Sequence, residues 1–232
     1  MERFSHPLVD AWITNSKIAK TTLVSLCQIN PKRVSVVYNG LNTTPSDPME
    51  LGERTMEVLT VANLNPRKGH LEYLATVKDV VKVIPNVKFV FVGRDDMGGQ
   101  IQSAIKECEL SDHVYCVGFQ PDISKWLKRA RLMVLPSLWN EGCPTSIMEG
   151  FTYGLPIVAY AIDGIPELIN NNVDGHLVTP GQSHKLTDAI LDILQNPANG
   201  QEMGNAGREK VLKTFSTEKC ANDHAQIFLK LY

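Results

Sequence analysis

The chain has 232 residues, a hydrophobic content of 43% and a formal net charge of −2, from 23 basic and 25 acidic residues. The balanced charge gives no basic field for nucleic acid or an anionic membrane, and no apolar run approaches the roughly 20 residues that span a bilayer. We therefore expect a globular protein with its own core, no nucleic-acid partner and no membrane span.

Cysteine and histidine usage argues against a disulfide framework or a metal site. The cysteines are odd in number and form no C-x-x-C pair: Cys27, Cys108, Cys116, Cys143 and Cys220. This usage is typical of reduced thiols in a cytoplasmic protein. The histidines are dispersed without ligand spacing, so we expect no structural or catalytic metal. Neither G-x-x-x-x-G-K-[ST] nor G-x-G-x-x-G is present.

The first part of the chain predicts a short strand, a helix and a second strand, at 11–14, 16–26 and 34–38. Residues 41–52 are rich in Thr, Pro, Ser, Asp and Gly, which is a linker composition. We therefore expect residues 1–45 to be the remnant of an N-terminal domain plus a linker. Residues 46–215 would form the main domain, and 216–232 a C-terminal helix.

From residue 57 onward, strands and helices alternate. The pattern predicts strands at 58–62, 87–92, 114–117, 132–135, 156–160 and 176–178. It predicts helices at 71–84, 98–110 and 122–130, one after residue 144, and others at 166–170, 183–195, 200–214 and 217–231. Such alternation implies parallel strands with right-handed crossovers. The predicted fold class is α/β, a doubly wound, Rossmann-like parallel sheet with C-terminal helices.

The centre of the predicted site is the stretch that follows the apolar strand 132–135. A proline ends this strand, whose carboxyl end opens into the loop 137–143, and ligands bind at that edge in open α/β sheets. Pro144 suits the first position of the next helix, and Thr145 and Ser146 follow with hydroxyls near the free amides. We interpret this as a helix start that can bind an anion.

Two carboxylates bracket this helix start, Glu141 before it and Glu149 inside it, with seven residues between them. At about 1.5 Å of rise per residue, Glu149 lies roughly 6–8 Å along the axis, about the reach from a phosphate to its ribose. The spacing suits a nucleotide diphosphate carrying a second sugar. Taken alone, each carboxylate is more often structural, because acidic residues are favoured near helix N-termini and most helical glutamates are solvated.

Other turns at the same edge carry candidate groups. Arg67 and Lys68 oppose the macrodipole at a helix start, a cost that an anionic ligand would relieve; a solvated basic turn is the alternative. Gly118 and Phe119 follow another strand, where an aromatic ring can pack on a nucleobase, although phenylalanine is more often core. The turn 163–167 also lies on this edge, and its glutamate could simply favour the helix start.

Together these residues resemble the donor half of the retaining GT-B glycosyltransferases of family four, the glycosyl transferases group 1. The resemblance covers roughly residues 13–232, and the E-x7-E element is its most specific piece. The matching pieces are Val37-Tyr38-Asn39-Gly40, Lys68-Gly69, Val92-Gly93, Val117-Gly118-Phe119, Leu135-Pro136-Ser137, Glu141 and Glu149, Gly154-Leu155-Pro156-Ile157-Val158 and Gly164-Ile165-Pro166-Glu167.

The resemblance implies a role for each candidate residue. Glu141 would be catalytic, contacting the transferred sugar near the reacting carbon, and Lys68 would neutralise the diphosphate leaving group. The donor-binding set would be Glu149 at the ribose, Arg67, Gly142, Cys143, Pro144 and Thr145 around the phosphates, and Gly118 and Phe119 beside the base. No bound metal or other cofactor is implied, because protein cations and a helix N-terminus stabilise the departing charge.

The resemblance also implies a retaining hexosyltransferase of polysaccharide biosynthesis, using a UDP- or GDP-linked donor and a glycan or lipid-linked acceptor. It would act in the cytoplasm, peripheral to the inner membrane face through an N-terminal GT-B domain that binds the acceptor. Residues 1–40 resemble only the last strand and helix of that domain, so we expect the isolated chain to be inactive or weakly active. Ala62 and Asn63 stand where the family usually carries an arginine, which Arg67 is the candidate to replace.

Two other functions remain open from the sequence. A non-catalytic nucleotide-sugar-binding module would need a partner chain to supply the acceptor domain. A sugar-nucleotide epimerase with two similar lobes would require paired acids and a histidine at the interlobe cleft, and the sequence offers no clear set.

Overall fold

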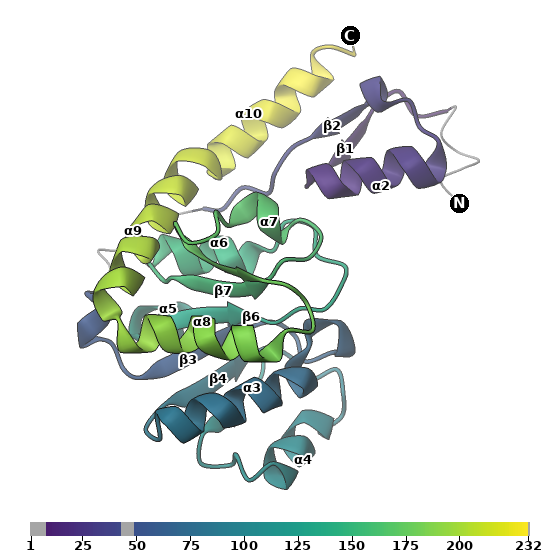
Figure 1. The fold of residues 1–232 in the computed structure, drawn as a ribbon. Helices are drawn as coiled ribbons and strands as arrows, with labels where there is room; N and C mark the ends of the chain where they lie inside the picture. Colours follow the sequence, from purple (N-terminus) through teal and green to yellow (C-terminus); the bar gives the residue numbers. More distant parts are fainter. Residues whose placement is uncertain (1–7, 43–48, 232) are drawn as a thin grey trace.

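The computed structural model describes residues 8–42 and 49–231. Residues 1–7, 43–48 and 232 lie outside the described residues, and with them part of the predicted linker and the predicted boundary at residue 45. The described residues form a two-stranded sheet near the N-terminus and a six-stranded sheet that makes up the main body (Figure 1).

The small sheet belongs to a strand–helix–strand unit. Strands β1 (Trp12–Thr14) and β2 (Val34–Val36) pair in parallel, and helix α2 (Lys17–Cys27) connects them, followed by a single 3₁₀ turn, η2 (Pro31–Arg33). The predicted strand, helix and strand are therefore confirmed, with ends shifted by one or two residues. We call this β1–α2–β2 segment, with the residues that flank its elements up to residue 42, the N-terminal unit. It lies beside α7 (Ile165–Leu168) and apart from the main sheet (Figure 1).

The main sheet confirms the predicted doubly wound α/β fold. Its strands, all parallel to their neighbours, run in the order β5-β4-β3-β6-β7-β8. They are β3 (Glu57–Val61), β4 (Lys88–Val92), β5 (Val114–Cys116), β6 (Leu132–Leu135), β7 (Ile157–Tyr160) and β8 (Gly175–Val178). The chain builds outward from β3 to β5 and then returns to place β6 against the other side of β3. The carboxyl ends of β3 and β6 are thus the topological switch point, where open α/β sheets bind ligands.

Helices cover both faces of this sheet (Figure 1). Helix α3 packs on α8 on one face, whereas α6 contacts β6 and β7 on the other and packs on α9. The remaining elements are α3 (His70–Val83), α4 (Gln100–Glu107), α5 (Ser124–Arg129), α6 (Thr145–Thr152), α8 (Ser183–Gln195), α9 (Pro197–Thr214), α10 (Thr217–Phe228), and the 3₁₀ turns η3 (Leu51–Glu53) and η4 (Pro66–Lys68). No helix in the described ranges is both long and apolar enough to cross a bilayer.

Several predicted helices, among them those at 98–110, 122–130 and 217–231, are longer than the observed ones. The helix predicted at 98–110 begins only at Gln100, because Gly98 and Gly99 have φ angles of +60° and +88°, and the chain leaves it at Glu109, with φ of +60°. These left-handed conformations cannot continue an α-helix. The last helix ends at Phe228 rather than at 231.

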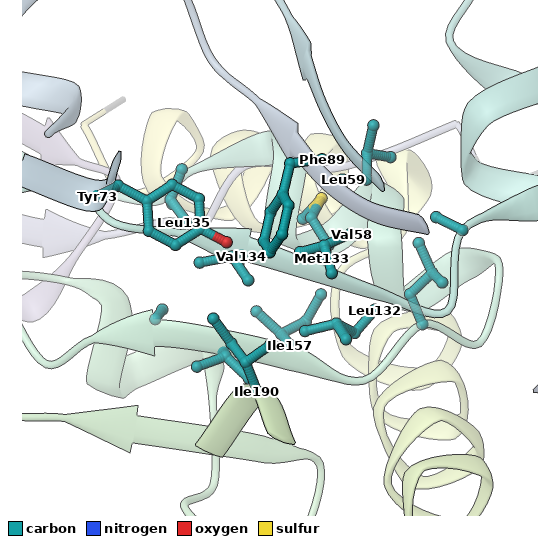
Figure 2. Close-up of a cluster of buried hydrophobic side chains, with 14 of the residues drawn as sticks. Val58, Leu59, Tyr73, Phe89, Leu132, Met133, Val134, Leu135, Ile157 and Ile190 are labelled. Carbon is teal, nitrogen blue, oxygen red and sulfur yellow. The ribbon is translucent and has the colours of Figure 1, made fainter. Parts of the chain in front are cut away.

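The core is built around β6, whose four residues are fully buried. Figure 2 shows side chains of β3, β4 and β7 and of helices α3 and α8 gathered around this strand. Tyr73 and Phe89 meet edge to face with ring centroids 5.9 Å apart. An unbroken apolar strand is what a sheet covered on both faces requires. The loops that leave β3 and β6 therefore start from the buried core.

Helix α9 packs closely on the backbone at Gly154, and this contact predicts the effect of a substitution at Gly204. A methyl group there would lie 2.0 Å from the carbonyl oxygen of Gly154. Although alanine favours a helix over glycine by about 1 kcal/mol, this clash with backbone dominates, and we expect Gly204→Ala to destabilise the fold by about 1–3 kcal/mol. Glu202→Ala, at an exposed position of the same helix, should change stability by less than about 0.5 kcal/mol. Urea unfolding measures both, and an unchanged midpoint for Gly204→Ala would contradict the packing argument.

Candidate functional site

Two loops meet at the switch point, residues 62–69 after β3 and 136–144 after β6. The N–H of Leu138 donates to the carbonyl oxygen of Arg67 at 2.8 Å. Gly69, with φ of +69°, comes so close to the second loop that a Cβ there would lie 2.2 Å from the carbonyl oxygen of Pro136. Only glycine fits this approach, which brings the side chains of the two loops within contact distance.

The two predicted cations and the first predicted carboxylate come together here. The Lys68 ammonium forms an ion pair with Glu141 Oε1, and Arg67 Nη1 lies 3.7 Å from the same oxygen. Arg67 also donates to the carbonyl oxygen of Asn140 at 3.1 Å. Lys68 and Glu141 are 9% and 6% exposed, and charges buried to this degree are tolerated because they are paired.

The main chain of Glu141 is held by the turn after β7. Its N–H donates to Asp163 Oδ2 at 3.0 Å, and its carbonyl oxygen accepts from the N–H of Gly164 at 2.9 Å. Asn140 and Asp163 both adopt left-handed backbone, with φ of +62° and +44°, a conformation that Asn and Asp tolerate better than other non-glycine residues. The Glu141 carboxylate is thus fixed by its backbone as well as by Lys68.

Helix α6 differs at its start from the sequence-based expectation. Pro144 is the residue before the helix, with an extended ψ of 115°, and the helix begins at Thr145. The hydroxyls of Thr145 and Ser146 do not cap it, and within the described part of the chain no side chain caps this end. The first amides of a helix have no partner inside it. An uncapped start beside two cations is suited to an anion.

Cys143 and Gly142 complete the loop that leads into α6. The Cys143 side chain is buried, and burial raises the pKa of its thiol, which disfavours a nucleophilic thiolate at neutral pH. Its carbonyl oxygen accepts from Asn39 Nδ2 at 2.9 Å. The interpretation of Cys143 as a small loop residue is therefore consistent with its environment.

Glu149 lies with Phe119, away from Glu141. It lines a cavity of about 210 Å³ together with Gly93, Phe119 and Asn63. Burial raises the pKa of the Glu149 carboxyl group. Phe119 is 69% exposed at the rim, so it is not a core residue. Gly118, with φ of +71°, is fixed behind it by a bond from the N–H of Gly93 to its carbonyl oxygen at 3.0 Å.

Glu141 faces a different and larger cavity, of about 510 Å³, shared between the site loop and α2. Trp139, 51% exposed, lines it with Asp163. Sequence reasoning singled out neither Trp139 nor Asp163, although both stand in stretches it marked as ligand-edge loops. Asn63, which lines the neighbouring cavity, accepts from the N–H of Arg94 at 3.0 Å, while Arg67 lies beside Glu141.

Comparison with known proteins identifies the family. The sequence profile of the glycosyl transferases group 1 matches residues 46–210. The chain belongs to this family. It is 29% identical over 215 residues to the amylovoran biosynthesis glycosyltransferase AmsK of Erwinia amylovora, covering 88% of this chain and 51% of that protein. It is 24% identical over 217 residues to the UDP-Gal:alpha-D-GlcNAc-diphosphoundecaprenol alpha-1,3-galactosyltransferase of Escherichia coli, covering 88% and 56%. The chain thus spans about half the length of these relatives.

Solved structures give the same fold. Anabaena HepE in complex with UDP and glucose superposes with a TM-score of 0.87 at 21% identity, covering 97% of this chain and 64% of that one. TarM superposes with a TM-score of 0.87 at 21% identity, covering 97% and 45%. These likenesses confirm the predicted Rossmann-like half of a GT-B fold. The roles of the individual site residues in this glycosyltransferase-family chain stay predictions.

The burial of Glu149 makes a prediction about pH. Because burial raises the folded-state pKa above the usual 4.5, the ionised carboxylate destabilises the fold above that pH. We expect Glu149→Gln to increase the free energy of unfolding at pH 7.5, at the low end of about 0.5–2 kcal/mol. The gain should shrink as the pH falls from the raised folded-state pKa towards 4.5 and vanish below 4.5, where the glutamate is protonated in both states. Urea unfolding from pH 4 to 7.5 measures the gain in the free energy of unfolding. Glu107→Gln, at an exposed position of α4, is the control. A gain independent of pH would contradict the prediction.

Proposed function

We propose that the chain is the donor-binding portion of a metal-independent, retaining hexosyltransferase. It would bind a UDP- or GDP-linked hexose for transfer to a glycan or lipid-linked acceptor. Membership of the glycosyl transferases group 1 supports glycosyl transfer. The observation that carries the proposal is the contact between Lys68 and Glu141 at the switch point, beside the uncapped start of α6.

The diphosphate would bind at the first turn of α6. Its start has no side-chain cap among the described residues, and Lys68 and Arg67 add two cations beside Glu141 of the loop that leads into it. Without a donor, Glu141 balances the charge of Lys68. A bound diphosphate would take over that role. Lysine, arginine and the helix start would then stabilise the charge that develops on the leaving group, which is why the proposal needs no metal ion.

Glu141 would face the hexose and Glu149 the ribose. The two acids line different cavities, as a ligand with a sugar on each side of its phosphates requires. Phe119 would lie beside the base at the rim of the Glu149 cavity. In the transfer step the bond between hexose C1 and the phosphate oxygen breaks, its electron pair leaving with the diphosphate. An acceptor hydroxyl oxygen bonds C1 on the same face, and its proton passes to an oxygen of the departing diphosphate.

The named relatives support the substrate classes. The Escherichia coli relative acts, by its name, with UDP-Gal on a diphosphoundecaprenol-linked sugar, and HepE was solved with UDP and glucose. We propose a donor and a lipid-linked or glycan acceptor of the same chemical kinds for this chain. Since the relatives are about twice as long, we propose that acceptor binding and full activity need an N-terminal GT-B domain.

Calorimetric titration with UDP and GDP tests donor binding. We expect micromolar to millimolar binding of one nucleotide, weakened about tenfold or more by Lys68→Ala or Glu149→Ala, since each removes a charged hydrogen bond worth about 1.5–3 kcal/mol. Lys78→Ala, an exposed lysine on α3, should bind as the wild type does. Circular dichroism checks that each variant is folded. If both site variants bind like the wild type, the assignments are wrong.

The ion pair between Lys68 and Glu141 leads to a second prediction, in which a substitution strengthens nucleotide binding instead of weakening it. The Glu141 carboxylate competes with phosphate for Lys68, and UDP has no hexose to contact Glu141. Glu141→Gln should therefore bind UDP about 3- to 10-fold more tightly, a gain of roughly 0.7–1.4 kcal/mol, while losing any slow donor hydrolysis. Glu72→Gln, an exposed acid on α3, is the matched control. Weaker binding of UDP by Glu141→Gln would show that Lys68 does not serve the diphosphate.

A further inference from the structure

The turn after β7 holds the N-terminal unit through one side chain. The Glu167 carboxylate accepts from the backbone N–H groups of Lys17 and Ile18, at 2.8 and 3.0 Å, and from the Tyr38 hydroxyl at 2.7 Å. It therefore caps α2, a helix 150 residues away, in addition to standing in the first turn of its own helix. Burial and the neighbouring carboxylate raise the pKa of Tyr38, so the hydroxyl remains a donor at neutral pH.

The same turn also holds the site loop. Asp163 and Gly164 bond the N–H and the carbonyl oxygen of Glu141. A Cβ at Gly164 would lie 1.7 Å from the carbonyl oxygen of Gly142 and 3.2 Å from the Cβ of Ser16. Gly164 is thus pressed between the site loop and the residue that precedes α2. One turn of five residues contacts the candidate donor loop on one side and the N-terminal unit on the other.

The N-terminal unit contacts the site loop directly as well. Asn39 donates to the carbonyl oxygen of Cys143 at 2.9 Å. Asn15 packs closely on Gly142: a Cβ added at Gly142 would lie 2.7 Å from Oδ1 of Asn15. The segment 141–143 is therefore enclosed between the turn and the N-terminal unit. Removing the unit would free one whole side of the loop that leads into α6.

We propose that Glu167 is a positioning residue for the donor loop. By fastening the N-terminal unit to α7, it keeps Gly142 and Cys143 in the conformation that binds the diphosphate, although it touches no ligand itself. The inference rests on the proposed function. A loop ordered in advance avoids the entropy cost of ordering on binding, so its affinity depends on the contacts that hold it. Carboxylate bonds to backbone amides are charge-assisted and among the stronger such contacts.

The experiment compares variants of the full chain by calorimetric titration with UDP and GDP and by amide hydrogen exchange without nucleotide. We expect Glu167→Ala to weaken nucleotide binding about fivefold or more and to speed exchange at residues 141–146. Glu167→Gln should have a smaller effect, because its amide oxygen remains an acceptor. Glu107→Gln, at an exposed position of α4, should change neither the affinity nor the exchange rate. All titrations are run well below the melting temperature, where a merely structural defect would leave affinity unchanged.

Tyr38→Phe distinguishes an effect of the Glu167 contact on nucleotide binding from an effect of reduced overall stability. It removes one of the three donors to Glu167 and should weaken binding less than Glu167→Ala does. The double variant should bind no more weakly than Glu167→Ala alone, because both changes act through one contact. If Glu167→Ala does not fold, Glu167→Gln takes its place in this comparison. The double variant Glu167→Gln and Tyr38→Phe should then lose less affinity than the sum of the two single losses.

The outcomes are distinct. Wild-type affinity and wild-type loop exchange in the folded Glu167 variants overturn the positioning role and leave the donor site intact. Additive losses in the double variant overturn it too. If the wild type binds neither nucleotide, the proposed function fails, and the inference fails with it.

Discussion

The pairing of a buried lysine with a buried glutamate is the interaction on which the site depends. Lys68 leaves the sheet after β3 and Glu141 after β6, and these strands are neighbours only because the chain reverses its direction of growth between β5 and β6. Neither charge would be stable in its 6–9% exposed position without the other. The order of the strands therefore decides where two opposite charges can be paired out of contact with water.

The start of α6 leaves hydrogen-bonding capacity unused. Helices α2 and α10 begin with serines, Ser16 and Ser216, whose side chains cap them, whereas α6 begins after a proline and, like α3, α4, α5, α7, α8 and α9, without a side-chain cap from the part of the chain that the structure describes. A cap stabilises a helix by about 1 kcal/mol. Helix α6 therefore lacks the stabilisation of a cap at its start. It also carries a half-buried Glu149 whose pKa is raised by burial, so that its ionised form destabilises the fold. Glu149 lines a cavity, and the start of α6 directly follows the loop that carries Glu141.

Sequence reasoning predicted the fold well because its signals are local. The four-residue apolar run of β6 and the helix at 183–195 were placed at their observed bounds. The errors were local too: positive φ at Gly98 and Gly99 shortened α4, and the extended ψ of Pro144 moved the start of α6 by one residue. The meeting of Lys68 and Glu141 could be anticipated since both follow parallel strands. The bonds of Asp163 to Glu141 and of Glu167 to α2 span 22 and 150 residues, and no pattern of spacing encodes them.

The candidate donor loop is therefore not a property of the six-stranded body alone. The loop is contacted by three parts of the chain: the loop after β3, the turn after β7, and Asn15 and Asn39 of the N-terminal unit. Residues 8–42 are 35 of 232, about 15% of the chain. The superposition on HepE covers 97% of the chain and therefore includes most of them. A donor half separated from its N-terminal unit would lose one wall of the loop together with the helix that Glu167 caps.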